Sequence, residues 1–211
     1  MVNHFRYILP AILLFLVNVA IGQVLRYTYN GKCKIELPDK LELQDSELNS
    51  IKRSGRQVNI NTLSGHITFQ QKGLNNNVKE AYSKYVRVII EYFEEDRKDP
   101  TYGIGDKVVV DRDMLYAVHE AAETGCNISK TPLIKVMSVQ SLNINGFPVL
   151  YYSYKRKGWE GKQPPVIVNV YRIFNRFESV TLTFSYRESE RQQWGSINEN
   201  IIKTFCFIKK Y

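Results

Sequence analysis

The stretch "VLYYSYKRKGWEGKQPPVIVNVYRIFNRFESVTLTFSY", Val149–Tyr186, decides the fold. Its alternation of apolar and polar residues predicts consecutive strands over Pro148–Arg156, Pro165–Asn175 and Ser179–Arg187. Most even-numbered positions in these strands are apolar, so we expect them to share one buried face of a sheet. They are Leu150, Tyr152, Tyr154, Val166, Val168, Val170, Val180, Leu182, Phe184 and Tyr186. Most of the aromatic content is thus expected in the core, and "KRKGWEGKQ" is expected to be a solvated hairpin loop.

The odd-numbered positions supply the candidate binding surface. If the strands pair near Tyr151–Tyr171 and Asn169–Ser185, a band of Tyr, Asn, Ser and Thr side chains lies open on the second face. Aromatic rings with polar tips suit contact with a protein or a glycan. The predicted binding residues are Tyr151, Lys155, Asn169 and Tyr171, with Lys155 forming a basic rim. The alternative is that a helix or a loop covers this band.

The rest of the chain predicts further strands and helices. Strands are expected over Cys33–Gln44 (interrupted at Pro38-Asp39), Gly65–Gly73, Lys84–Glu95 and Leu133–Gly146. Helices are expected over Ser46–Gly55, Asp111–Gly125 and Ser189–Phe205, each beginning at a residue that can cap its N-terminus. The sequence shows no repeat, low-complexity tract or linker, so we expect one domain over residues 23–211.

The N-terminus has the pattern of a signal peptide over residues 1–22. Arg6 precedes an apolar run, Tyr7–Gly22, which is shorter than the roughly 20 apolar residues of a membrane span. Small residues before Gln23 predict cleavage between Gly22 and Gln23, while the alternative is an uncleaved anchor helix. No second apolar run follows, so no transmembrane segment is expected in the mature chain. The protein is thus expected to be exported, to the periplasm or out of the cell.

The net charge is positive but unevenly spread. It is +8 for the whole chain, and it becomes +7 after cleavage because only Arg6 is lost. The stretch 91–113 is rich in Asp and Glu, whereas Lys and Arg dominate the stretch 149–176. Two solvated faces explain this distribution, and the alternative is a basic patch that meets acidic polymers or lipid headgroups.

Three cysteines remain after cleavage, Cys33, Cys126 and Cys206. Export permits disulfides, but the odd number prevents complete pairing. Cys206 lies between two phenylalanines and reads as a core residue, while Cys33 and Cys126 could pair. No C-x-x-C spacing occurs, so neither a zinc site nor a thioredoxin-type site is predicted.

Motifs for catalysis are largely missing. The sequence has no G-x-S-x-G elbow and no Gly-rich phosphate loop, and no cofactor is predicted. "HEAAE", His119–Glu123, differs from the H-E-x-x-H motif of zinc proteases because Glu123 stands where the second histidine is needed. An ion pair on a helix surface explains His119 and Glu123. The alternative is a metal-dependent hydrolase that uses His119, Glu120 and Glu123. No recognisable motif for reading nucleic acid is present, so a nucleic-acid partner is not expected.

Several segments together resemble the PsbP-like and DcrB-like family and uncharacterised exported bacterial proteins of this type. They are "KIELPDKLELQ", "YVRVIIEYFE", "LNINGFPVLYYSY", "VIVNVYRIFNRFESVTLTFSY" and the terminal "IIKTFCF". The resemblance implies an α+β fold, an α/β/α sandwich with a central antiparallel sheet. Family members mostly bind proteins or act as scaffolds and share no catalytic residues. The expectation is therefore a non-enzymatic binding or scaffold module in the bacterial envelope, with an unidentified protein or glycan partner.

Overall fold

The computed structural model describes residues 24–44, 50–61, 66–79, 81, 84–158 and 163–209. Residues 1–22 and part of the loop "KRKGWEGKQ" lie outside this description. A seven-stranded antiparallel sheet has the order β3-β6-β7-β11-β10-β9-β8. Its strands are β3 (Leu41–Leu43), β6 (His66–Gln71), β7 (Val86–Glu94), β8 (Leu133–Ile144), β9 (Phe147–Arg156), β10 (Val166–Phe174) and β11 (Glu178–Arg187).

A second sheet of five strands has the order β12-β2-β1-β5-β4. Its strands are β1 (Val24–Tyr29), β2 (Cys33–Pro38), β4 (Ser50–Ser54), β5 (Gln57–Asn61) and β12 (Cys206–Phe207). Two α-helices, α1 (Arg112–Ile128) and α2 (Arg191–Thr204), and the 3-10 turn η3 (Glu188–Glu190) complete the described elements. The sequence predicted no second sheet.

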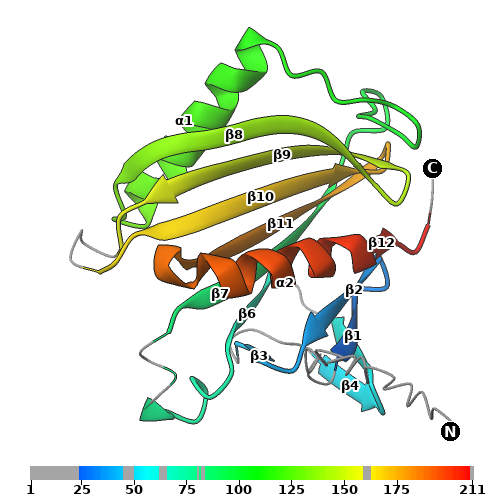
Figure 1. The fold of residues 1–211 in the computed structure, drawn as a ribbon. Helices are drawn as coiled ribbons and strands as arrows, with labels where there is room; N and C mark the ends of the chain where they lie inside the picture. The colour runs from blue at the N-terminus through cyan, green and yellow to red at the C-terminus, as the bar shows by residue number, and fades with distance from the viewer. Residues whose placement is uncertain are drawn as a thin grey trace, which may run out of the picture.

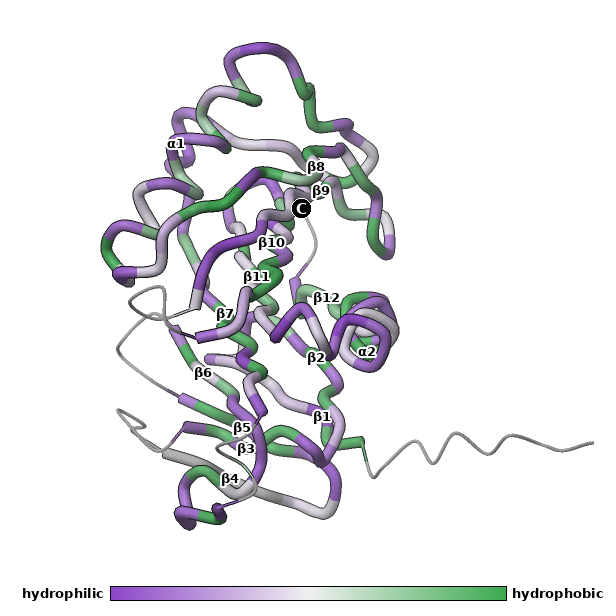
Figure 2. Tube along the Cα trace, turned by 60° about the vertical axis from the view of Figure 1, so that its left-hand side comes forward, coloured by the Kyte–Doolittle hydropathy of each residue, from purple (hydrophilic) through white to green (hydrophobic). Residues whose placement is uncertain are grey.

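The helices lie on opposite faces of the seven-stranded sheet (Figure 1). Helix α1 packs through Val118 against Leu150 of β9, whereas α2 lies over the face that carries Tyr171 of β10. The five-stranded sheet is on the side of α2, and Figure 2 shows α2 nearly end-on beside β2 and β12. The predicted α+β class and α/β/α layering are confirmed. None of the helices within the described residues has the length and apolar character needed to cross a membrane.

The core forms where strand alternation turns apolar side chains toward α2 and the second sheet. On β7, the alternate residues Val86, Val88 and Ile90 are at most 4% exposed. Phe69 of β6 is fully buried and meets the Tyr27 ring of β1 at 4.7 Å, so aromatic contacts join the two sheets. Burying one such large apolar side chain contributes roughly 1.5–3 kcal/mol to folding.

The strand register corrects the expected single buried face. Val168 of β10 lies opposite Tyr154 of β9, as expected, but also opposite Ser185 of β11. Asn169 lies opposite Phe184, so the predicted pairing of Asn169 with Ser185 is wrong. The even positions of β10 therefore share a face with the odd positions of β11. Side chains alternate with period two, so the register set by the β10–β11 turn places the even-numbered residues of β11 on the face opposite to the even-numbered residues of β10. Both faces of this sheet carry buried apolar residues, which alternation within each strand does not reveal.

Two predicted helices differ from the structure. Residues 50–54 of the predicted helix Ser46–Gly55 form strand β4, and residues 46–49 lie outside the described residues. Strand β4 pairs with β5 through a turn at Gly55, whose φ of +58° suits glycine, and Val58 of β5 is buried. Helix α1 does begin after Asp111, which with Asp113 was one of two possible caps, and the Asp111 Oδ1 accepts from the Met114 N–H. The helix continues past Gly125 to Ile128.

The turn at Pro38-Asp39 also connects the two sheets. The segment 33–44 splits there into β2 and β3, as predicted, but the two strands belong to different sheets. One short turn thus carries the chain from the five-stranded to the seven-stranded sheet. A strand interrupted by proline need not continue in the same sheet.

Candidate functional site

The four residues predicted to form a binding surface lie on the face that α2 covers. Tyr151 and Tyr171 are directly opposite on β9 and β10, as predicted, and their ring centroids are 4.8 Å apart. Tyr171 and Asn169 are each 6% exposed, and Tyr151 is half-buried. The expectation of an open band is therefore wrong for Tyr171 and Asn169, and the alternative of a covering helix is correct.

A hydrogen-bonded network ties this band to α2. The Tyr151 hydroxyl donates to Asn169 Oδ1 at 3.0 Å, and Asn169 Nδ2 donates to the Tyr186 hydroxyl at 3.2 Å. Asn198 of α2 donates through Nδ2 to the Tyr171 hydroxyl at 3.3 Å. Burial raises the pKa of Tyr171, so this phenol stays neutral. In this arrangement the Tyr171 hydroxyl joins α2 to the sheet, while Tyr151, Asn169 and Tyr186 bond to one another across β9, β10 and β11.

Lys155 lies at the rim of the same face, where its Nζ forms an ion pair with Glu188 at 2.7 Å. Its charge is therefore neutralised by η3. The structure brings Tyr151, Asn169 and Tyr171 together, and it places Lys155 apart from their hydrogen-bond network.

The alternative enzyme site on α1 gains no support from its geometry. His119, Glu120 and Glu123 are all exposed. Within the part of the chain that the structure describes, no three His, Cys, Asp or Glu residues are grouped to hold a metal ion.

The three cysteines are free thiols. Burial raises the pKa of Cys33, and burial also raises the pKa of Cys126. Cys206 lies opposite Lys34, and Phe207 lies opposite Cys33. Cys206 and Cys33 therefore point to opposite faces of the five-stranded sheet, which disfavours a bond between them.

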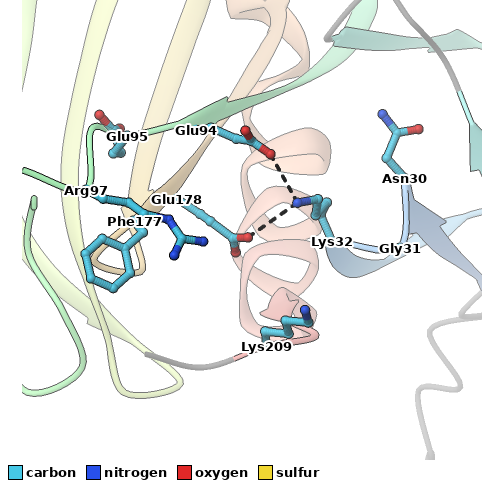
Figure 3. Close-up of a pocket in the computed structure, with 9 residues that line it drawn as sticks. All are labelled: Asn30, Gly31, Lys32, Glu94, Glu95, Arg97, Phe177, Glu178 and Lys209. Atoms are coloured by element: carbon cyan, nitrogen blue, oxygen red, sulfur yellow. Dashed lines mark hydrogen bonds and ion pairs between the residues drawn. The ribbon is translucent and has the colours of Figure 1, made fainter.

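A charged cavity of about 280 Å³ lies where the two sheets meet, and we call it the junction cavity. It is lined by Asn30, Gly31, Lys32, Glu94, Glu95, Arg97, Phe177, Glu178 and Lys209 (Figure 3). These residues come from the β1–β2 turn, the end of β7, the β10–β11 turn and the C-terminal segment. Asn30 and Gly31 adopt φ of 45° and 64°, the left-handed conformation that a tight hairpin requires, and so carry Lys32 to the cavity.

An ion cluster around Lys32 lines one side of the junction cavity. Glu94 of β7 and Glu178 of β11 are directly opposite each other, a pairing of like charges that destabilises a sheet. The Lys32 Nζ lies between them, 3.3 Å from Glu94 and 3.6 Å from Glu178 (Figure 3). Glu178 also accepts from the Tyr92 hydroxyl at 3.0 Å. Each carboxylate thus has a partner within the protein.

The titration of this cluster follows from the same contacts. A hydrogen bond with Tyr92 raises the pKa of Lys32, burial opposes that change, and a hydrogen bond with Glu94 reinforces it. Burial raises the pKa of Tyr92 to about 12. At neutral pH the cluster therefore holds an ammonium group and a neutral phenol.

Two cations on the other side of the junction cavity have no carboxylate partner. The Glu95 carboxylate forms an ion pair with the Arg172 guanidinium at 3.2 Å and accepts a hydrogen bond from the Ser179 hydroxyl. Among the described residues, no ion pair reaches Arg97 or Lys209. Arg97 lies 5.8 Å from the centre of the Phe177 ring. The cavity therefore offers two cations to an anionic group, and the Phe177 ring supports the Arg97 guanidinium.

The sequence patterns did not predict this cavity. Its residues are spread from Asn30 to Lys209, and the acidic stretch 91–113 by itself predicts a solvated face. The Asn30-Gly31 pair was the available local signal, because it predicts a tight hairpin. No local sequence pattern indicates that this hairpin places Lys32 beside Glu94 and Glu178.

Comparisons with family profiles and with curated proteins find no match for this sequence. Solved structures do resemble it. The solution structure of cyanobacterial PsbP (CyanoP) from Synechocystis sp. PCC 6803 is 14% identical, with a TM-score of 0.52, and the match covers 90% of this chain and 95% of that chain. This likeness shows a PsbP-like fold.

Two further structures have lower scores. A structure from Bacteroides thetaiotaomicron is 10% identical with a TM-score of 0.46; the match covers 90% of this chain but 49% of that one, so this chain spans about half its length. PA94 of Pseudomonas aeruginosa, a protein of unknown function, is 10% identical with a TM-score of 0.40, over 75% of this chain and 96% of that chain. The PsbP-like fold expected from the sequence resemblance is confirmed. A fold alone does not assign an activity.

Proposed function

We propose that this chain is an exported, non-enzymatic binding module of the bacterial envelope that takes an acidic segment of a partner protein in its junction cavity. The observation that carries the proposal is that Arg97 and Lys209, beside Phe177, form no ion pair with any described residue, in a cavity whose lining carboxylates are already paired. An arginine fork matches a carboxylate in geometry, and an adjacent ring supports the guanidinium.

The overall charge supports the choice of an acidic partner. The chain carries a net charge of +8, which raises the local concentration of anionic partners and speeds their association. The PsbP-like fold supports a binding role as an analogy only.

The proposed export rests on the sequence of residues 1–22. Expression with a C-terminal tag in a bacterial host, followed by fractionation and N-terminal sequencing, tests it. We expect the protein outside the cytoplasm with Gln23 as its first residue. Recovery of full-length protein in the cytoplasm would contradict the proposal.

Binding is tested with a fluorescent peptide that contains a run of glutamates, by anisotropy. The protein is the chain from Gln23 to Tyr211, which contains every described residue. We expect the double variant Arg97→Gln/Lys209→Gln to bind the peptide about three- to tenfold more weakly, because each exposed ion pair contributes roughly 0.2–1 kcal/mol.

The matched control removes two positive charges elsewhere. Arg112 and Lys130 are exposed at the two ends of α1, so Arg112→Gln/Lys130→Gln lowers the net charge equally without touching the cavity. Equal weakening by both double variants would show attraction by net charge alone and would contradict a site in the junction cavity.

A further inference from the structure

A second cavity, of about 400 Å³, lies beside the N-terminal turn of α2. We call it the lysine cavity, and its wall includes Asp39, Lys40, Gln71, Lys72, Lys84 and Trp194. The β2–β3 turn supplies the first two of these residues and the end of β6 the next two. Its volume is within the range of roughly 300–1,000 Å³ that small-molecule pockets occupy. It shares no lining residue with the junction cavity.

Two residues of this wall each carry a buried polar atom that has no hydrogen-bond partner among the described residues. Trp194 is 4% exposed, and its Nε1 has no hydrogen-bond partner. The Oε1 of Gln71 is likewise buried without one. The indole nitrogen can only donate and the amide oxygen can only accept. Buried polar groups are nearly always hydrogen-bonded, so an orphaned donor and an orphaned acceptor in one cavity wall point to a missing partner.

The charge of the cavity indicates the sign of that partner. Lys40, Lys72 and Lys84 face a single carboxylate, Asp39, and none of these lysines forms an ion pair with another described residue. Helix α2 begins here after Glu190, whose carboxylate makes no capping hydrogen bond, so the first-turn N–H groups add positive partial charge beside that one acidic residue. The uncompensated charge is therefore positive.

We propose that the lysine cavity binds a small anion that carries hydroxyl groups, of the kind found in sugar acids and sugar phosphates. The anionic group meets the lysine ammonium groups. The hydroxyl groups, which donate and accept, supply the acceptor that Trp194 lacks and the donor that Gln71 lacks. A simple carboxylate anion such as acetate satisfies the lysines but leaves the Gln71 oxygen without a donor. A neutral sugar can bond to Trp194 and Gln71 but leaves the lysines without an anionic partner.

The test observes the Trp194 indole directly. The sequence has two tryptophans, so the variant Trp159→Phe leaves Trp194 as the single source of an indole N–H signal. The ¹⁵N-labelled chain from Gln23 to Tyr211 with this substitution is titrated with glucuronate, glucose 6-phosphate, glucose and acetate at constant ionic strength. We expect a saturable shift of the indole signal with a Kd below about 1 mM for glucuronate or glucose 6-phosphate, and binding at least about tenfold weaker for glucose and acetate.

The two anions separate the possible sources of the charge. Binding of glucuronate alone assigns a carboxylate ligand, and binding of glucose 6-phosphate alone assigns a phosphate ester. No saturable shift with either anion, or equal binding of glucose or acetate, would overturn the proposal.

Variants separate this site from the junction cavity. Lys40→Gln/Lys72→Gln changes two exposed side chains, so the fold should be retained, and we expect at least about threefold weaker binding of the hydroxylated anion. The control Lys34→Gln/Lys130→Gln, also exposed, and the junction-cavity variant Arg97→Gln/Lys209→Gln should both bind as the parent does. An unchanged affinity in Lys40→Gln/Lys72→Gln would overturn the assignment to this cavity, whatever the outcome with acidic peptide.

Discussion

The junction cavity and the lysine cavity are both built from charged residues of distant segments, but they differ in how those charges are used. In the junction cavity, Lys32 lies between Glu94 and Glu178, and it holds the end of the seven-stranded sheet against the β1–β2 turn. In the lysine cavity, the ammonium groups have no such partners among the described residues, and two buried polar atoms lack hydrogen bonds. Charge that is paired internally stabilises the fold, whereas unpaired charge beside unsatisfied groups is available to a ligand.

Removing the paired lysine should have the largest effect on stability. Lys32→Met leaves the Glu178 carboxylate, whose side chain is 8% exposed, opposite Glu94 without a cation. We expect the free energy of unfolding to fall by about 2–3 kcal/mol, somewhat below the loss for a fully buried pair because 37% of the Lys32 side chain is exposed. Urea unfolding at neutral pH measures this loss.

Two further variants sharpen that result. Lys34→Met removes an exposed lysine from the adjoining strand β2 and should change stability by less than about 0.5 kcal/mol. Adding Glu178→Gln to Lys32→Met should recover part of the loss, because no buried charge is left unpaired. If Lys32→Met were as stable as Lys34→Met, the cluster would not hold the two sheets together.

A smaller effect is expected beside the lysine cavity, where Glu42 of β3 orders the loop that follows Lys72. Its carboxylate accepts from the backbone N–H of Gly73 at 2.9 Å and of Asn75 at 2.6 Å. Burial tends to raise the pKa of Glu42, but these hydrogen bonds outweigh burial and lower it. Glu42→Gln should cost about 1 kcal/mol at neutral pH, because one strong acceptor is lost at a partly solvated site.

The pH dependence of this contribution has a defined sign. Since the pKa of Glu42 is lower in the folded state, its contribution is present above the unfolded value of about 4.3 and is lost as pH falls through the folded value. Urea unfolding between neutral and acidic pH should therefore show a smaller loss for Glu42→Gln than for the parent. The exposed residue Glu120 gives the control variant Glu120→Gln, and a parallel pH profile in all three proteins would contradict this role of Glu42.

Local patterns predicted most strands, but they did not predict how the strands combine. Alternation located β7, β9, β10 and β11 to within a residue or two at each end. The face that each strand shares with its neighbour depends on register, and the odd offset between β10 and β11 follows from the turn between them. For the same reason, the sequence predicts correctly that Tyr171 lies opposite Tyr151, yet it does not reveal that α2 covers the face on which Tyr171 lies.

The two cavities were beyond sequence reasoning for a related reason. Lys32 and Glu178 are far apart in the chain, and they meet only because the five-stranded sheet, absent from the predicted fold, docks against the seven-stranded one. Gln71 and Trp194 become orphaned polar groups only once β6 and α2 are packed. Pairing and burial are properties of tertiary packing, which composition and spacing do not contain.

Lysine acetylation rates measured by mass spectrometry test the contrast between the two cavities most directly. Only the deprotonated amine reacts, and hydrogen bonds with Tyr92 and Glu94 raise the pKa of Lys32 against the opposing effect of burial. The account predicts that Lys32 reacts more slowly than Lys40, Lys72 and Lys84, because a raised pKa leaves less free amine and its ion pairs occupy the ammonium group. Equal rates at Lys32 and Lys72 would contradict it.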